Sequence, residues 1–258
     1  MKIAVLVKEV PDTSGDRSLD EETGLTRRGA GDVVLDEINE RALELALAHA
    51  GSSEGTEVVA LTMAPESAGA NLRRALAMGA HSAVHVVDDD LAGADALLTA
   101  TVLAAALRRG DYDLVVTGNQ STDGSGGVVP AMVAELLGAT LLSGMRSVQI
   151  TPDGVRGTRA VEGATQTVSA ELPAVLSVTE AMPEGRFPSF KGIMAAKKKP
   201  YEKLTLADLG VDASPTATAA SIMTAVAQRP PRAAGRTVHD DGTAARQLVD
   251  YLVEQRLV

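Results

Sequence analysis

The stretch that decides the fold reads Asp113-Leu114-Val115-Val116-Thr117-Gly118-Asn119-Gln120-Ser121-Thr122-Asp123-Gly124-Ser125-Gly126-Gly127-Val128-Val129. Its first residues form an apolar, β-branched run typical of a buried strand, and residues 128–137 have the apolar spacing of a helix. The loop between them is rich in small hydroxyls and in glycines, which let a backbone approach a ligand closely. Such a loop before a helix start is typical of phosphate binding. It contains neither a Walker loop nor a G-x-G-x-x-G pattern, so an ordinary tight connection remains the alternative.

A strand–helix alternation surrounds this stretch. We expect strands at residues 2–7, 57–62, 83–87 and 113–116, and a weaker one at 139–142. Helices are expected at residues 36–50, 66–78, 95–109 and 128–137. Asp36 is the expected N-cap of the first helix, and Gly51 ends it. The alternation predicts an α/β fold with a mostly parallel, Rossmann-like sheet of the adenine-nucleotide alpha-hydrolase type, with ligands at the carboxyl ends of its strands.

The pattern changes after residue 144. Short alternating runs at residues 147–150, 155–160, 165–171 and 174–178 predict antiparallel hairpins added to the parallel sheet. A one-turn helix is expected at 205–209, an extended arm at 212–241 and a final amphipathic helix at 244–255. Ordering such an arm costs entropy, so the arm predicts a partner subunit that holds it in place. The alternative is a disordered tail. We therefore divide the chain into a nucleotide-binding domain, 1–211, and a C-terminal arm and helix, 212–258.

Composition limits the possible functions. The 258 residues have a net charge of −10 and only 2% aromatic residues, which argues against nucleic acid as a partner. The absence of cysteine excludes disulfides and thiolate metal sites. The apolar run after Met1 is too short for a signal peptide, and no stretch is long enough to span a membrane. We expect a cytoplasmic protein without membrane insertion.

No catalytic constellation is visible. The four histidines are His49, His81, His85 and His239, and no His-Glu-x-x-His pattern joins any of them. They are best interpreted as surface or hydrogen-bonded core residues. The run Asp88-Asp89-Asp90 fits a solvated loop better than a cation site. The sequence therefore predicts a protein that is not an enzyme and has no metal site.

Two longer motifs carry a resemblance to a known family. They are Arg159-Ala160-Val161-Glu162-Gly163-Ala164-Thr165-Gln166-Thr167-Val168 and Arg186-Phe187-Pro188-Ser189-Phe190-Lys191-Gly192-Ile193-Met194-Ala195-Ala196-Lys197-Lys198-Lys199. Together with shorter matches near Lys8, Asp36 and Met78, they resemble the beta subunits of electron transfer flavoproteins. The resemblance runs from Met1 to about Asp212, and more loosely to the end of the chain.

The resemblance implies a function in electron transport. Such a subunit pairs with a larger alpha subunit that holds most of the single FAD, and it buries one structural AMP. The heterodimer accepts electrons from flavoprotein dehydrogenases, such as acyl-CoA dehydrogenases. It passes them toward the respiratory chain through an electron transfer flavoprotein–quinone oxidoreductase or a similar acceptor.

By position, the residues expected to contact AMP are Leu6, Asp36, Glu37, Ile38, Asn39, Met63, Ser121, Thr122, Asp123, Gly124, Ser125, Gly126, Gly127, Val128 and Val129. Backbone groups near Lys8-Glu9 and Met63-Ala64-Pro65 are candidates to hold the adenine. Some relatives that bifurcate electrons bind a second FAD in place of AMP. The sequence Ser125-Gly126-Gly127 departs from theirs and favours AMP.

The resemblance also implies a recognition loop, residues 180–200, that docks on partner dehydrogenases. The residues expected to dock are Met182, as an apolar anchor, and Arg186, Lys197, Lys198 and Lys199. The family's usual Asn-Glu-Pro-Arg is replaced here by Pro183-Glu184-Gly185-Arg186. The alternative is that the lysines cap a turn and Met182 fills a small core.

Two other functions share this kind of sheet. One is an enzyme that hydrolyses adenine nucleotides, and the other is a stand-alone nucleotide-binding protein. The hydrolase needs a Ser-Gly-Gly-x-Asp-Ser loop after its first strand, where this chain has Lys8-Glu9-Val10-Pro11. The long arm disfavours a stand-alone protein.

Overall fold

The computed structural model describes residues 1–15, 17–28, 31–212, 221, 223–232, 234–235 and 237–258. They form two compact units, Met1–Thr224 and Ala225–Val258. The expected boundary after residue 211 falls just before residues 213–220, which lie outside the described residues.

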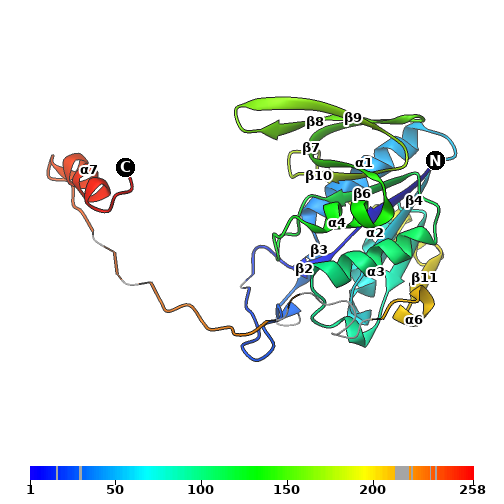
Figure 1. Ribbon diagram of the computed structural model, residues 1–258, viewed down its shortest axis with the longest axis horizontal. Coiled ribbons are helices and arrows are strands. Elements are labelled where there is room, and N and C mark those ends of the chain that lie inside the picture. The colour runs from blue at the N-terminus through cyan, green and yellow to red at the C-terminus, as the bar shows by residue number, and fades with distance from the viewer. Residues whose placement is uncertain (16, 29–30, 213–220, 222, 233, 236) are drawn as a thin grey trace. The chain divides into compact units, whose positions relative to one another are not determined.

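The first unit is built on one nine-stranded sheet of order β11-β5-β4-β1-β6-β10-β7-β8-β9 (Figure 1). Seven strands run parallel: β11 (Tyr201–Leu204), β5 (Ser82–Val86), β4 (Glu57–Met63), β1 (Lys2–Leu6), β6 (Leu114–Gly118), β10 (Ala174–Val178) and β7 (Thr140–Thr151). The hairpin β8 (Gly154–Val161) and β9 (Ala164–Glu171) continues the sheet from β7 in antiparallel fashion. The predicted mostly parallel sheet with added antiparallel strands is confirmed.

One strand was predicted with the wrong pairing. Residues 174–178 were expected in an antiparallel hairpin, but β10 pairs in parallel with both β6 and β7. After β9 the chain returns to the sheet's centre, and all five residues of β10 are buried there. The two runs expected at 139–142 and 147–150 are one continuous strand, β7, whose register shifts at a bulge beside β8.

Helices cover both faces of the sheet. α1 (Glu37–Ser52) and α2 (Gly69–Met78) pack on one face, and α3 (Ala96–Arg108) and α4 (Val129–Leu137) on the other. Successive side chains of a strand point to opposite faces. Accordingly Ile3 and Val5 of β1 join the α1–α2 core, whereas Ala4 and Leu6 join the α3–α4 core.

Smaller elements complete the two units. The first unit also contains β2 (Glu9–Pro11) paired with β3 (Val33–Leu35), single turns at Glu66–Ala68 and Asp89–Leu91, α5 (Phe190–Ala196) and α6 (Leu206–Leu209). The strands β2, β3 and β11 and the helix α5 were not predicted. The second unit contains α7 (Ala244–Glu254), close to the expected helix at 244–255.

The order of the strands fixes where a ligand can bind. From β1 the chain moves to β4 and β5, and from β5 it crosses over through α3 to β6 on the opposite side of β1. The direction of winding therefore reverses between β1 and β6. In open parallel sheets, ligands bind at the carboxyl ends of the strands beside such a switch point.

His85 on β5 is a hydrogen-bonded core residue, as predicted. Its ring is fully buried, with Nε2 3.0 Å from the Ala64 carbonyl oxygen and Nδ1 2.8 Å from the Tyr201 hydroxyl. A carbonyl can only accept, so in the neutral ring Nε2–H donates to Ala64 and Nδ1 accepts from Tyr201. Burial lowers the pKa of His85, although the bond to Ala64 opposes the shift.

This burial predicts a loss of stability in mild acid. Because the folded state depresses the pKa, the contribution of His85 is complete above the ordinary histidine value of about 6.5 and is lost as the pH falls below it. The melting temperature should therefore fall between pH 7.5 and pH 5, and less steeply in His85→Gln. The matched control is His239→Gln, at an exposed residue of the second unit, which should keep the wild-type slope. If the melting temperature fell equally steeply with pH in wild type and in His85→Gln, His85 would not be the group that causes the loss of stability.

Candidate functional site

The loop after β6 and the start of α1 meet at the switch point through one carboxylate. Asp36 is fully buried, and its Oδ1 accepts from the backbone N–H groups of Ile38 (3.0 Å) and Asn39 (3.4 Å). Its Oδ2 accepts from the backbone N–H (2.7 Å) and the hydroxyl (2.9 Å) of Thr122. Four donors therefore occupy the Asp36 carboxylate, which caps α1 and holds the loop against it.

A second carboxylate gathers basic side chains at the same loop. Asp123, whose side chain is 2% exposed, lies 2.7 Å from Lys8 Nζ and 2.8 Å from Arg28 Nη2. Burial by itself raises the pKa of this carboxyl, but the hydrogen bonds and charge of Lys8 and Arg28 outweigh it and hold the pKa well below the usual range. Arg17 donates to the Thr122 carbonyl oxygen. Three cations thus surround the loop.

The loop's backbone has the geometry of an anion site. Ser125 and Gly127 both have left-handed φ values, of 50° and 66°, and a side chain on Gly126 would meet nothing within 4 Å. α4 follows at once, and its N-cap, Val128, gives it no side-chain hydrogen bond. The first N–H groups of a helix have no partner within the helix, so an anion at this uncapped end is stabilised by them and by the helix dipole.

Asn119, at the end of β6, adds an unsatisfied acceptor. Among the described residues, its Oδ1 is the buried side-chain atom that lacks a hydrogen-bond partner. A buried polar atom without a partner costs free energy, so a ligand group that donates a hydrogen bond to it would remove that cost. The carboxyl ends of β1 and β6 therefore bring together cations, uncapped N–H groups and, among the described residues, one buried acceptor without a partner; we refer to this place as the β1–β6 crevice.

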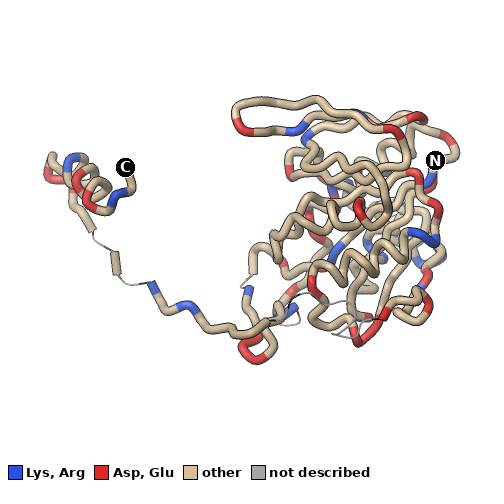
Figure 2. The backbone as a smooth tube through the Cα atoms, viewed as in Figure 1, with Lys and Arg blue, Asp and Glu red and all other residues tan. Residues whose placement is uncertain are grey.

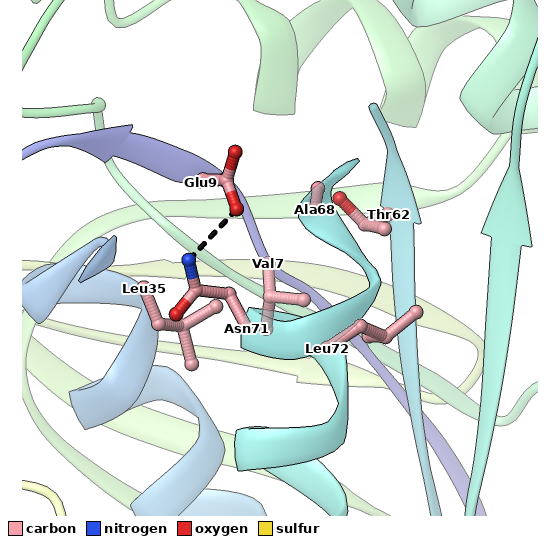
Figure 3. A pocket seen from close by; sticks show the side chains of 7 residues that line it. All are labelled: Val7, Glu9, Leu35, Thr62, Ala68, Asn71 and Leu72. Carbon is pink, nitrogen blue, oxygen red and sulfur yellow. Dashed lines mark hydrogen bonds between the residues drawn. The ribbon is translucent and has the colours of Figure 1, made fainter. Parts of the chain in front are cut away.

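The hollow beside the crevice does not add room for a ligand. Figure 3 shows Glu9 and Asn71 pointing toward each other across it, with Asn71 Nδ2 2.7 Å from Glu9 Oε2. Its lining residues are Val7, Glu9, Leu35, Thr62, Ala68, Asn71 and Leu72, and they leave no space for a water molecule. We interpret the buried Glu9 carboxylate as structural, because it ties β2 to α2.

Most of the predicted nucleotide residues come together. Asp36 to Asn39 and Ser121 to Val129 meet at the crevice, whereas Leu6 and Met63 lie at the ends of the neighbouring strands β1 and β4. Leu6 is buried in the α3–α4 core, so its side chain faces away from solvent. The sequence did not single out Arg17, Arg28 or Asn119. The two arginines lie about 100 residues before the loop, and no local pattern connects them to it.

The predicted docking residues differ in exposure. Met182 was expected as an apolar anchor, but it is 6% exposed and belongs to the α1–α2 core. Lys199 Nζ donates to the carbonyl oxygens of Leu76 (2.9 Å) and Ala80 (2.6 Å), at the end of α2. The positions of these two residues fit the alternative expectation, a core methionine and a capping lysine. The guanidinium of Arg186 is paired with Glu44, whereas Lys197 and Lys198 are exposed.

Two aromatic residues of the same segment were missed. Phe187 is 84% exposed and Phe190 is 81% exposed, and Ile193 and Met194 on α5 are about half exposed. Large apolar side chains gathered at a surface indicate a site of protein–protein contact. The sequence contained this signal, because both phenylalanines of the chain lie within four residues of each other.

Two negative findings hold for the described residues. They contain no group of three or more His, Asp or Glu side chains placed to bind a metal ion. None of their helices has both the length and the apolar character needed to cross a bilayer. In Figure 2, Lys and Arg positions alternate with Asp and Glu positions along most of the described backbone.

Comparisons with known proteins agree with the resemblance. A family model described as "Electron transfer flavoprotein domain" matches residues 27–209. The electron transfer flavoprotein subunit beta of Mycobacterium tuberculosis is 46% identical over 263 residues, which cover 99% of each chain. That of Bacillus subtilis is 33% identical over 82% of each chain. The caffeyl-CoA reductase-Etf complex subunit CarD of Acetobacterium woodii is 30% identical over 100% of each chain. This chain therefore belongs to the electron transfer flavoprotein family, among its beta subunits.

Proposed function

We propose that this chain pairs with an alpha subunit and forms with it an electron carrier of the cytoplasm. The heterodimer accepts electrons from flavoprotein dehydrogenases, such as acyl-CoA dehydrogenases, and passes them to an electron transfer flavoprotein–quinone oxidoreductase or a similar acceptor. The chain contributes no catalytic residue; it holds AMP, supports FAD on the alpha subunit and docks on the donor. The observation that carries this proposal is the nucleotide crevice at the β1–β6 switch point in a chain of this family.

AMP fits the chemistry of the crevice. A phosphate monoester carries up to two negative charges, which the uncapped start of α4 and the cations Lys8, Arg17 and Arg28 can balance. Asn119 Oδ1 can accept a hydrogen bond from a donor group of the same ligand. AMP supplies no redox chemistry, so its role here is to fill the crevice and stabilise the fold.

A hydrolase has less support in this structure. After β1 the chain enters β2, whose Glu9, Val10 and Pro11 pair with β3. A strand in this place leaves no glycine-rich turn to hold a pyrophosphate. The only glycine-rich loop at the switch point follows β6, among the described residues of the parallel sheet.

The AMP site can be tested at Ser125. Ser125→Glu places a carboxylate where the loop would receive the phosphate, and charge repulsion should abolish AMP retention in the purified heterodimer. Ser125→Gln is the matched control, because it has the same size and the same left-handed backbone but no charge. It should retain most of the AMP. Nucleotides released on denaturation would be identified and counted; one AMP per Ser125→Glu heterodimer would place the site elsewhere.

The docking surface can be tested at Phe190. A few apolar anchors usually dominate binding, so Phe190→Ala should raise the KM of the dehydrogenase for the carrier by about tenfold, with unchanged AMP and FAD. Met182→Ala should instead act on the core. It should destabilise the fold by about 2–3 kcal/mol and leave the rate of electron transfer per folded molecule intact. Changing the exposed Lys197 and Lys198 to Gln should mainly flatten the dependence of the electron-transfer rate on ionic strength. A normal KM in Phe190→Ala would rule out this surface.

The contact with the alpha subunit can be tested on α7. Its face of Ala245, Leu248, Val249 and Leu252 follows the helical period, and none of its residues is buried. Leu248→Asp should prevent co-elution with the alpha subunit, because a buried unpaired charge is costly. Arg246→Asp puts the same group on the opposite side of the helix and should leave co-elution intact. Equal behaviour of the two variants would show that α7 does not bind through this face.

A further inference from the structure

The docking segment, residues 182–199, is attached to α1 and α2 along its length. Its first residue, Met182, is in the core, and its last, Lys199, caps the end of α2. Between them, a Cβ on Gly185 would lie 3.0 Å from Glu40 Cβ, and one on Gly192 would lie 2.3 Å from the Ala77 carbonyl oxygen. Gly192 is needed for this close approach, because a Cβ there would overlap the backbone of α2, whereas a Cβ on Gly185 would require Glu40 to shift by a few tenths of an ångström.

The strongest polar contact of the segment joins Arg186 to Glu44 in the middle of α1. Arg186 Nε lies 2.7 Å from Glu44 Oε2, and Nη2 lies 2.8 Å from Oε1. The backbone N–H of Arg186 also donates to Oε2, at 3.1 Å. The carboxylate therefore holds both the guanidinium fork and the backbone of the residue that precedes Phe187. Burial by itself raises the pKa of Glu44, but the hydrogen bonds and charge of Arg186 outweigh it and lower the pKa, so the pair stays charged at neutral pH.

The outward side of the same segment is apolar. Phe187 and Phe190 are more than four-fifths exposed, while the contacts on the inward side fix the backbone that carries them. A surface that is already ordered before binding avoids the entropy cost of ordering on contact. The segment thus combines a fixed inner side with an exposed aromatic side.

We propose that Glu44 is a positioning residue for electron transfer: by holding Arg186, it presents Phe187 and Phe190 to the partner dehydrogenase in a preformed arrangement. This inference rests on the proposed docking function. Arg186 is 45% exposed and Glu44 is 18% exposed, and half-exposed ion pairs add little to stability. Loss of the pair should therefore affect docking much more than folding.

The test uses the complete FAD-containing heterodimer and a cognate dehydrogenase. Glu44→Gln should raise the KM for the carrier by roughly threefold to tenfold through lost preorganisation, with kcat, AMP content and melting temperature close to wild type. Arg186→Gln should do the same. The double variant should be no worse than either single variant, because the two residues act through one contact. The matched control is Glu54→Gln, which removes the same charge from an exposed residue beyond the end of α1 and should keep the wild-type KM.

Each other outcome has a distinct meaning. A normal KM in Glu44→Gln together with a raised KM in Phe190→Ala would overturn the positioning role and keep the docking surface. Normal values in both variants would overturn the docking function as well. A fall in melting temperature or kcat that accompanies the higher KM would show a structural role for Glu44, and an equal rise in Glu54→Gln would show a general effect of charge. Both results would also overturn the proposal.

Discussion

The buried carboxylate of Asp36 is the contact on which the arrangement of the loop after β6 depends. It accepts two N–H groups from the start of α1 and two donors from Thr122, so it joins segments that lie 86 residues apart in the sequence. A buried charge is stable only where its oxygens are hydrogen-bonded, and here all four bonds come from the two segments themselves. The same contact therefore satisfies the charge and holds the loop after β6 against the start of α1.

A common principle operates at both candidate sites. At the crevice, Asp123 holds Lys8 and Arg28 beside the loop; at the docking segment, Glu44 holds Arg186 beside the exposed aromatic residues. In each case a shielded carboxylate orients a more exposed cation. Asp123 and Glu44 thus each organise a segment of the protein's own chain, next to side chains that are more exposed than they are.

Sequence patterns predicted the parallel sheet, its helices and the glycine-rich loop, because these depend on local periodicity and on turn residues. They could not predict the partners of β10, since five consecutive buried residues look the same in either orientation. They also could not distinguish Met182 in the core from Phe190 at the surface, because both are apolar residues in one irregular segment. Arg28 was missed for a related reason: its contact with Asp123 spans 95 residues and leaves no trace in the local sequence.

The position of β10 has a consequence for synthesis of the chain. β6 and β7 lie on either side of β10. The two halves of the sheet therefore cannot be joined until residues 174–178 have left the ribosome. Until then β6 keeps one unpaired edge of apolar residues, and such edges readily pair with other chains. Pairings between distant parts of a chain also form slowly. Because β6 ends at residue 118 and β10 at residue 178, this edge stays unpaired while roughly a quarter of the 258-residue chain is made, and the growing polypeptide is prone to aggregate during that interval.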